Sequence, residues 1–271
     1  MADSIRKCLD EADTVSELKL LLSASKDKTF VVVEGDDDCR LFKSLLGKNV
    51  DIVQSYQSKL GVEKMIKRYF PRQKRVIGIR DKDYQEKPIC NRVFYCDYCC
   101  SEMMIIANDD CIERICNSFC NTSIAPKTLR SNCLKCLEYL SELRYLNEKK
   151  KWKVVFDGIK PSVLYDVNQS IMDKNILEHL NKCNPTNPIS TKRLLSVKTT
   201  FPGKCKEEDL LYITNGHDFI NIFYCLGNMK EGIRFVGKAL RSSFGKTEFQ
   251  HTQLYNKLFD YQQKHTLNII D

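Results

Sequence analysis

Three apolar segments rich in β-branched residues alternate with helical patterns early in the chain, and this alternation constrains the fold more than any other feature. The segments are TFVVVEG (29–35), NVDIVQSY (49–56) and KRVIGIRDKD (74–83). Helical patterns follow the first two, DDDCRLFKSLLG (36–47) and LGVEKMIKRYF (60–70). Strand, helix, strand, helix, strand is typical of a parallel sheet with right-handed crossovers. The sequence therefore predicts an α/β fold whose sheet is flanked by helices.

Further elements are expected on both sides of this pattern. Apolar spacing indicates a first helix over 4–24, and NRVFYCD (91–97) is a fourth strand. SEMMIIANDDCIERICNSF (101–119) begins a long helix. After about residue 125 the patterns are mainly helical, with a short strand at WKVVF (152–156). We therefore predict two domains, an α/β domain over 1–125 and a mainly helical domain over 126–271.

The composition is that of a soluble globular protein. Hydrophobic residues make up 42% and charged residues 29% of the 271 residues, which excludes a disordered chain. The N-terminal segment lacks the apolar core of a signal peptide, and no apolar run is long enough to cross a membrane. A cytoplasmic protein without membrane contact is expected.

The chain contains 14 cysteines, two pairs of which have the CxxC spacing. These pairs are Cys96/Cys99 and Cys133/Cys136. In an intracellular protein they indicate zinc ligands or reduced thiols. The gap between the pairs is longer than in most zinc ribbons, and Cys96 lies on a strand-like run. Buried thiols are therefore favoured over zinc.

The net charge of +8 is a mild bias toward polyanions. Basic residues cluster at KRYFPRQKR (67–75), KKKWK (149–153) and GKALRSSFGK (237–246). Each cluster alone is more often a solvated face than a binding site. If the protein acts on nucleic acid, the first two clusters are expected to flank the site and bind phosphates. The candidates in the second cluster are Lys149, Lys150 and Lys151.

Carboxylates stand at the ends of two predicted strands. Glu34 directly follows the first strand, and Asp81 and Asp83 end the third. Because the carboxyl ends of parallel strands share one edge of a sheet, these groups can face one point and suit a hard divalent cation. The three aspartates at 36–38 have a simpler explanation, since they can cap the next helix and complement its dipole.

These residues resemble a known family. VVVEGDDD, an amphipathic helix and then VIGIRDKDY look like the TOPRIM domain of topoisomerases, bacterial primases and the overcoming-lysogenization-defect (OLD) nucleases. The match is closest to nucleases that work beside a separate ABC-type ATPase in anti-phage defence, such as the AriB subunit of the PARIS system. The similarity is most specific over 29–106.

The resemblance implies a site and a fold. The fold would be a TOPRIM-like parallel sheet, and Mg²⁺ or Mn²⁺ would be held by Glu34, Asp81 and Asp83, with Asp38 assisting. Glu102, which opens the helix after the fourth strand, would complete the catalytic set.

NGHDF (215–219) resembles a C-terminal motif of the same subgroup. Its His217 and Asp218 would support the site or contact substrate at the domain junction. The alternative is that Asn215 or Asp218 only caps the following helix.

The expected function is a metal-dependent endonuclease that cleaves RNA, such as tRNA, or DNA, as a toxin-like effector controlled by a partner ATPase. The ATPase must be a separate chain, because FGKTEF (244–249) lacks the glycine and the strand of a P-loop. The alternative is a non-catalytic TOPRIM-like module that binds nucleic acid or assembles with a partner. A purely structural protein would leave the strand-end carboxylates unexplained. The sequence leaves the substrate and homodimerisation open.

Overall fold

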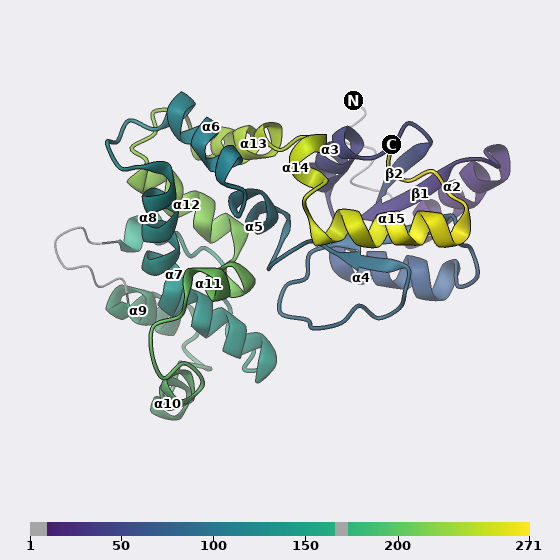
Figure 1. The fold of residues 1–271 in the computed structure, drawn as a ribbon. Helices are drawn as coiled ribbons and strands as arrows, with labels where there is room; N and C mark the ends of the chain where they lie inside the picture. Colours follow the sequence, from purple (N-terminus) through teal and green to yellow (C-terminus); the bar gives the residue numbers. More distant parts are fainter. Residues whose placement is uncertain (1–9, 166–172) are drawn as a thin grey trace. The chain divides into compact units, whose positions relative to one another are not determined.

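The computed structural model describes residues 10–165 and 173–271, which form two compact units (Figure 1). The first unit contains the described residues up to Asp97 together with Phe244–Asp271, and the second is Tyr98–Ser243. Residues 4–9 of the first predicted helix lie outside the described ranges. None of the helices in these ranges combines the length and apolar character that a bilayer-spanning helix requires.

The first unit is built on a parallel sheet of four strands in the order β2-β1-β3-β4. Its strands are β1 (Thr29–Val33), β2 (Val50–Gln54), β3 (Val76–Arg80) and β4 (Val93–Tyr95). Strands β1 and β3 occupy the centre and are buried along their whole length. The predicted parallel α/β sheet is confirmed, and the strands that end at Glu34 and Asp81 are direct neighbours.

Helices flank this sheet. The elements of the first unit are α2 (Glu11–Ala24), α3 (Asp36–Leu45), α4 (Ser58–Lys64), the π-helical turn η1 (Met65–Tyr69), α14 (Lys246–Phe249) and α15 (Gln253–His265). Apolar residues of α2, α4 and η1 form one core with Phe30 and Val32 of β1. Helix α4 approaches β3 closely at Gly78, where a β-carbon would lie 2.7 Å from Val62 Cγ1. This approach brings the first turn of α4 toward the end of β3.

The last helix of the chain, α15, belongs to the sheet unit. Figure 1 shows it in yellow alongside the strands, and it contacts β4. The Asp97 carboxylate accepts hydrogen bonds from the backbone N–H groups of Gln253 (2.7 Å) and Leu254 (2.9 Å) at the start of α15. The Phe94 and Tyr261 rings pack edge to face with centroids 5.4 Å apart. These contacts tie the C-terminus to β4.

The division into units therefore differs from the predicted boundary near residue 125. The chain leaves the sheet unit after Asp97 and returns at Phe244. Long-range contacts of the C-terminal helix decide this division, and local sequence patterns do not contain them. The prediction of a helical C-terminal half is confirmed.

The second unit is helical. It contains α5 (Ser101–Ile106), α6 (Asp109–Phe119), α7 (Pro126–Lys149), α8 (Pro161–Leu164), α9 (Asp173–Cys183), α10 (Thr191–Thr200), α11 (Glu207–Ile213), α12 (Gly216–Leu226) and α13 (Ile233–Ser243). Helix α7 is central and contacts α6, α9, α10, α11 and α12.

Two local predictions in the second unit are wrong. The long helix expected from residue 101 is two helices, because Asn108 caps α6 by accepting a hydrogen bond from the Cys111 N–H. The expected strand at 152–156 is irregular. There, the N–H groups of Val154 and Val155 donate to the side chains of Asn147 and Asn184, so side chains satisfy backbone groups that a strand partner would otherwise bind.

A candidate acidic site at the carboxyl edge of the sheet

Glu34 lies at the carboxyl end of β1, where two hydrogen bonds fix its largely buried carboxylate. Oε1 accepts from the backbone N–H of Asp81 at 3.1 Å, and Oε2 accepts from the Ser58 hydroxyl at 2.8 Å. Asp81 is the first residue after β3, and Ser58 opens α4. The neighbouring parallel strands thus bring the strand-end glutamate to the first aspartate of the DxD sequence.

Arg80, the last residue of β3, places a buried positive charge among these carboxylates. Its side chain is 1% exposed, and its Nε lies 3.7 Å from Glu34 Oε1. Nη1 donates a short hydrogen bond to Glu63 of α4, and Nη2 donates to Asp83 Oδ2 at 3.1 Å. The guanidinium carbon lies 5.2 Å from the centre of the Tyr95 ring. Arg80 therefore offsets the like-charge repulsion of this edge.

Asp83 turns back toward Arg80. Strand β3 ends at Arg80, and the backbone of Asp83 is left-handed, with φ of 48°. Because β3 ends at Arg80, strand alternation does not fix the direction of the Asp83 side chain. Asp83 Oδ2 also accepts from Lys59 Nζ of α4 at 3.1 Å, so two cations share one carboxylate oxygen.

Asp38 is positioned as a helix cap. The backbone N–H of Gly35 donates to its Oδ2 at 3.1 Å, and Asp36 pairs with Arg40 at 2.7 Å. All three aspartates of 36–38 lie in the first turn of α3, where they complement the helix dipole. This is the simpler of the two explanations for the acidic run, and the metal role of Asp38 stays a prediction.

The donor set of this edge suits a hard cation. Glu34, Asp81 and Asp83 supply carboxylate oxygens, the ligands that Mg²⁺ and Mn²⁺ prefer. Arg80 and Lys59 already balance part of the negative charge, so an ion must compete with them. Among the described residues, no group of three ligand atoms within 4.8 Å of one another includes Glu34 or Asp83, so a metal held by all three carboxylates stays a prediction.

Glu102 belongs to the second unit, where it lies in the first turn of α5. Its Oε1 is 3.8 Å from Arg241 Nη1, and both side chains are largely buried. A β-carbon at Gly216 would lie 2.6 Å from Glu102 Oε2, so only glycine lets α12 approach α5 this closely. The NGHDF motif therefore contacts Glu102 directly. The catalytic role of Glu102 stays a prediction.

The other residues of this motif hold α12 in place. Asn215 caps the helix by accepting from the N–H groups of His217 and Asp218. Asp218 is buried and forms a two-pronged ion pair with Arg144, at 2.6 and 3.1 Å. Burial raises the pKa of Asp218, and Arg144 opposes this shift. His217 is exposed. The Asp218 carboxylate is thus committed to Arg144.

Most lysines and arginines of the first two basic clusters, 67–75 and 149–153, are exposed. Helix α7 ends at Lys149, and Lys150 and Lys151 follow it. The Lys149 Nζ atom lies 5.6 Å from the centre of the Tyr145 ring. Residues 67–75 lead into the amino-terminal end of β3, the opposite end from Asp81. The five residues of β3 separate this cluster from the acidic edge, and a strand rises by about 3.3 Å per residue. The cluster and the acidic edge thus lie at opposite ends of the strand. The cluster at 67–75 therefore does not adjoin the acidic edge, and its role in phosphate binding stays a prediction.

The cysteines of the described ranges are free thiols, most of them buried or half-buried. A second acidic group lies within the helical unit, where Glu138, Glu142 and Cys205 offer ligand atoms within 4.8 Å of one another. The Cys205 N–H donates to Glu138, and its thiol lies 3.8 Å from Glu142 Oε1. Burial is the main cause that raises the pKa of Cys205 to about 12, and the negative charge of Glu142 is the second, so the thiol stays protonated at neutral pH.

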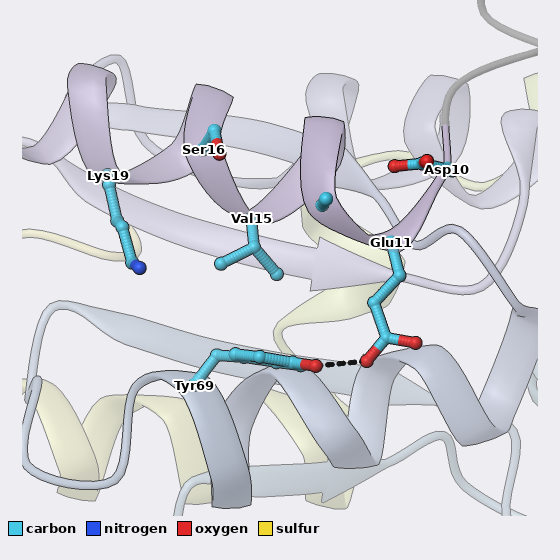
Figure 2. Close-up of a pocket in the computed structure, with 7 residues that line it drawn as sticks. Asp10, Glu11, Val15, Ser16, Lys19 and Tyr69 are labelled. Atoms are coloured by element: carbon cyan, nitrogen blue, oxygen red, sulfur yellow. Dashed lines mark hydrogen bonds between the residues drawn. The ribbon is translucent and has the colours of Figure 1, made fainter.

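A hollow of about 500 Å³ lies between α2 and η1 (Figure 2). Figure 2 shows Tyr69 reaching across it to Glu11, to which the phenol donates a short hydrogen bond. This bond lowers the pKa of Glu11 and raises that of Tyr69. None of the predicted site residues lines the hollow, and the bond between Tyr69 and Glu11 spans it.

Sequence reasoning missed the basic half of the acidic edge. The sequence did contain a signal for Arg80, because it is a charged residue at the end of an otherwise apolar strand, directly before the DxD sequence. Lys59 and Ser58 had no such signal, because their place depends on how α4 packs against β3.

No protein-family model matches the chain, and a search of curated proteins finds no match either.

Proposed function

We propose that the protein is a metal-dependent endonuclease with a TOPRIM-like site at the carboxyl edge of its parallel sheet. The observation that carries this proposal is the bond from the Asp81 N–H to the Glu34 carboxylate. It joins a strand-end glutamate to a DxD sequence that directly follows the neighbouring strand, as the resemblance to TOPRIM nucleases implies.

Glu34, Asp81 and Asp83 would hold Mg²⁺ or Mn²⁺, which would activate water for attack on a phosphodiester and stabilise the leaving oxygen. The chain's own residues orient these ligands. Ser58 and the Asp81 N–H fix both oxygens of Glu34, and Arg80 holds Asp83. The buried guanidinium also stays close to the site, where it would counter charge that builds up during phosphodiester hydrolysis.

The resemblance implies a nucleic-acid substrate, and the net charge is consistent with one. A net charge of +8 favours a polyanion, and we propose RNA, such as tRNA, or DNA as the substrate. Lys149, Lys150 and Lys151 are proposed phosphate contacts. By resemblance, a separate ABC-type ATPase would control the enzyme as a cytoplasmic anti-phage effector.

The second candidate function is a TOPRIM-like module that binds nucleic acid without cutting it. The observation that favours it is the pairing of Asp83 with both Arg80 and Lys59, which occupies an oxygen that catalysis would need.

A nuclease assay separates the two functions. Purified protein is incubated with labelled tRNA, single-stranded RNA and duplex DNA, with Mg²⁺, with Mn²⁺ or with a chelator. We expect cleavage that requires the metal and is lost in Glu34→Gln, whose amide keeps the size of the side chain and removes its charge. The control is Glu17→Gln, an exposed glutamate of α2. Metal-independent cleavage, or equal cleavage by Glu34→Gln, would contradict the proposal. Binding without cleavage under every condition would favour the module.

A further inference from the structure

Two cations neutralise the acidic edge, and the structure holds them very differently. Arg80 is 1% exposed and bonds to Glu63, to Asp83 and, through Nε at 2.9 Å, to the Asp81 carbonyl. Moving its guanidinium would break all of these bonds and leave buried groups unpaired. Arg80 is therefore a fixed part of the site.

Lys59 is held by a much weaker contact. Its side chain is 40% exposed, and its ammonium is 3.1 Å from Asp83 Oδ2, which already accepts from Arg80. Ion pairs of such exposure contribute at most about 1 kcal/mol. The flexible stem of a lysine can carry its ammonium several ångströms away without changing the backbone.

A divalent cation at Asp83 would compete with this lysine. A dication attracts the carboxylate more strongly than an ammonium does, and it repels the ammonium at the same short distance. The ammonium released in this way stays tethered to the first turn of α4, next to Ser58 and the Glu34 carboxylate that Ser58 binds.

We propose that Lys59 is the exchangeable counter-ion of the acidic edge: a divalent cation replaces it on Asp83, and the released ammonium binds a phosphate of the nucleic acid. This inference rests on the proposed function and adds its regulation. Metal and polyanion then strengthen each other's binding, and by linkage the effect is equal in both directions. Without metal, Lys59 shields the carboxylate and is withheld from phosphate.

The test compares Lys59→Met with a matched control, Lys28→Met. Lys28 pairs with Asp51 at 2.9 Å and has nearly the same exposure, 41%, but it precedes β1 at the opposite end of the sheet. Mn²⁺ affinity is measured on the full chain by electron paramagnetic resonance of the free ion. We expect Lys59→Met to bind Mn²⁺ about threefold more tightly than the wild type, and Lys28→Met to bind it like the wild type. Circular dichroism confirms that each variant is folded.

The second measurement is fluorescence anisotropy of a labelled single-stranded oligonucleotide, with and without Ca²⁺. Ca²⁺ should tighten binding to the wild type and to Lys28→Met, and Lys59→Met should lose most of this gain. If the wild type binds Mn²⁺ and Lys59→Met binds it with the same affinity, the proposed exchange of Lys59 is overturned, whereas the proposed metal site is not. A gain from Ca²⁺ that persists in Lys59→Met would overturn the phosphate role. Absence of Mn²⁺ binding to the wild type would overturn both this inference and the proposed metal site.

Discussion

Replacing Arg80 by methionine should destabilise the sheet unit strongly. Methionine keeps much of the apolar volume and removes the charge, which leaves Glu34, Glu63 and Asp83 without their shared counter-ion. Removing one partner of a buried ion pair costs about 3–5 kcal/mol. The carboxylates retain 15%, 17% and 31% exposure, so partial hydration places the expected loss at the lower end, about 3 kcal/mol.

Hydrogen exchange measured by mass spectrometry reads this loss directly. Since about 1.4 kcal/mol corresponds to a factor of ten, the amides of β1 and β3 should exchange about a hundredfold faster in Arg80→Met, if they exchange through opening of the sheet. Lys28→Met, which breaks an exposed pair of the same unit, should change exchange by less than about fivefold. The double variant Arg80→Met/Glu63→Gln should recover part of the loss, because one unpaired carboxylate is gone. An effect of Arg80→Met no larger than that of Lys28→Met would refute the role of Arg80 as the counter-ion.

Two further predictions concern packing and pH. Gly216→Ala should destabilise the helical unit by about 1–3 kcal/mol in a urea titration, because its β-carbon would overlap Glu102. The control Gly203→Ala should be neutral, because its β-carbon meets nothing within 4 Å. Equal unfolding midpoints for the two variants would contradict the close approach of α12 to Glu102. Burial raises the pKa of Asp97 above its ordinary 3.8, so folding favours the protonated acid. The contribution of Asp97 to the stability of the folded state is therefore fully present below pH 3.8 and is lost as the pH rises through the pKa of the folded state. We therefore measure the difference in melting temperature between the wild type and Asp97→Asn, and we expect this difference to decrease as the pH is raised from 3.5 to 7. A difference that increases with pH would contradict the direction of the pKa shift.

The sheet could be predicted from sequence because its signals are local. The β-branched run of β1 and the strand before Asp81 are continuous and fully buried, and each is followed directly by an acidic residue. Parallel crossovers then require these ends to share an edge. The meeting of Glu34 with Asp81 followed from this topology without any side-chain detail.

What could not be predicted depends on distant contacts or on single turns. Asp83 leaves the alternation of the strand because β3 ends one residue before the DxD sequence, and a left-handed turn follows. Lys59 reaches Asp83 because Gly78 lets α4 approach β3. Helix α15 joins the sheet unit through Asp97, more than a hundred residues earlier in the chain. Each of these is a tertiary contact that overrides local patterns.

The most direct test of the central claim is a crystal soaked in Mn²⁺ and measured at a wavelength where manganese scatters anomalously. We expect an anomalous peak at the carboxyl edge of the sheet, within about 2.5 Å of carboxylate oxygens of Glu34 and of Asp81 or Asp83. The same soak of Glu34→Gln should weaken this peak. A wild-type map with no peak there, or with manganese only at other carboxylates such as Glu138 and Glu142, would contradict the claim that this edge is the metal site.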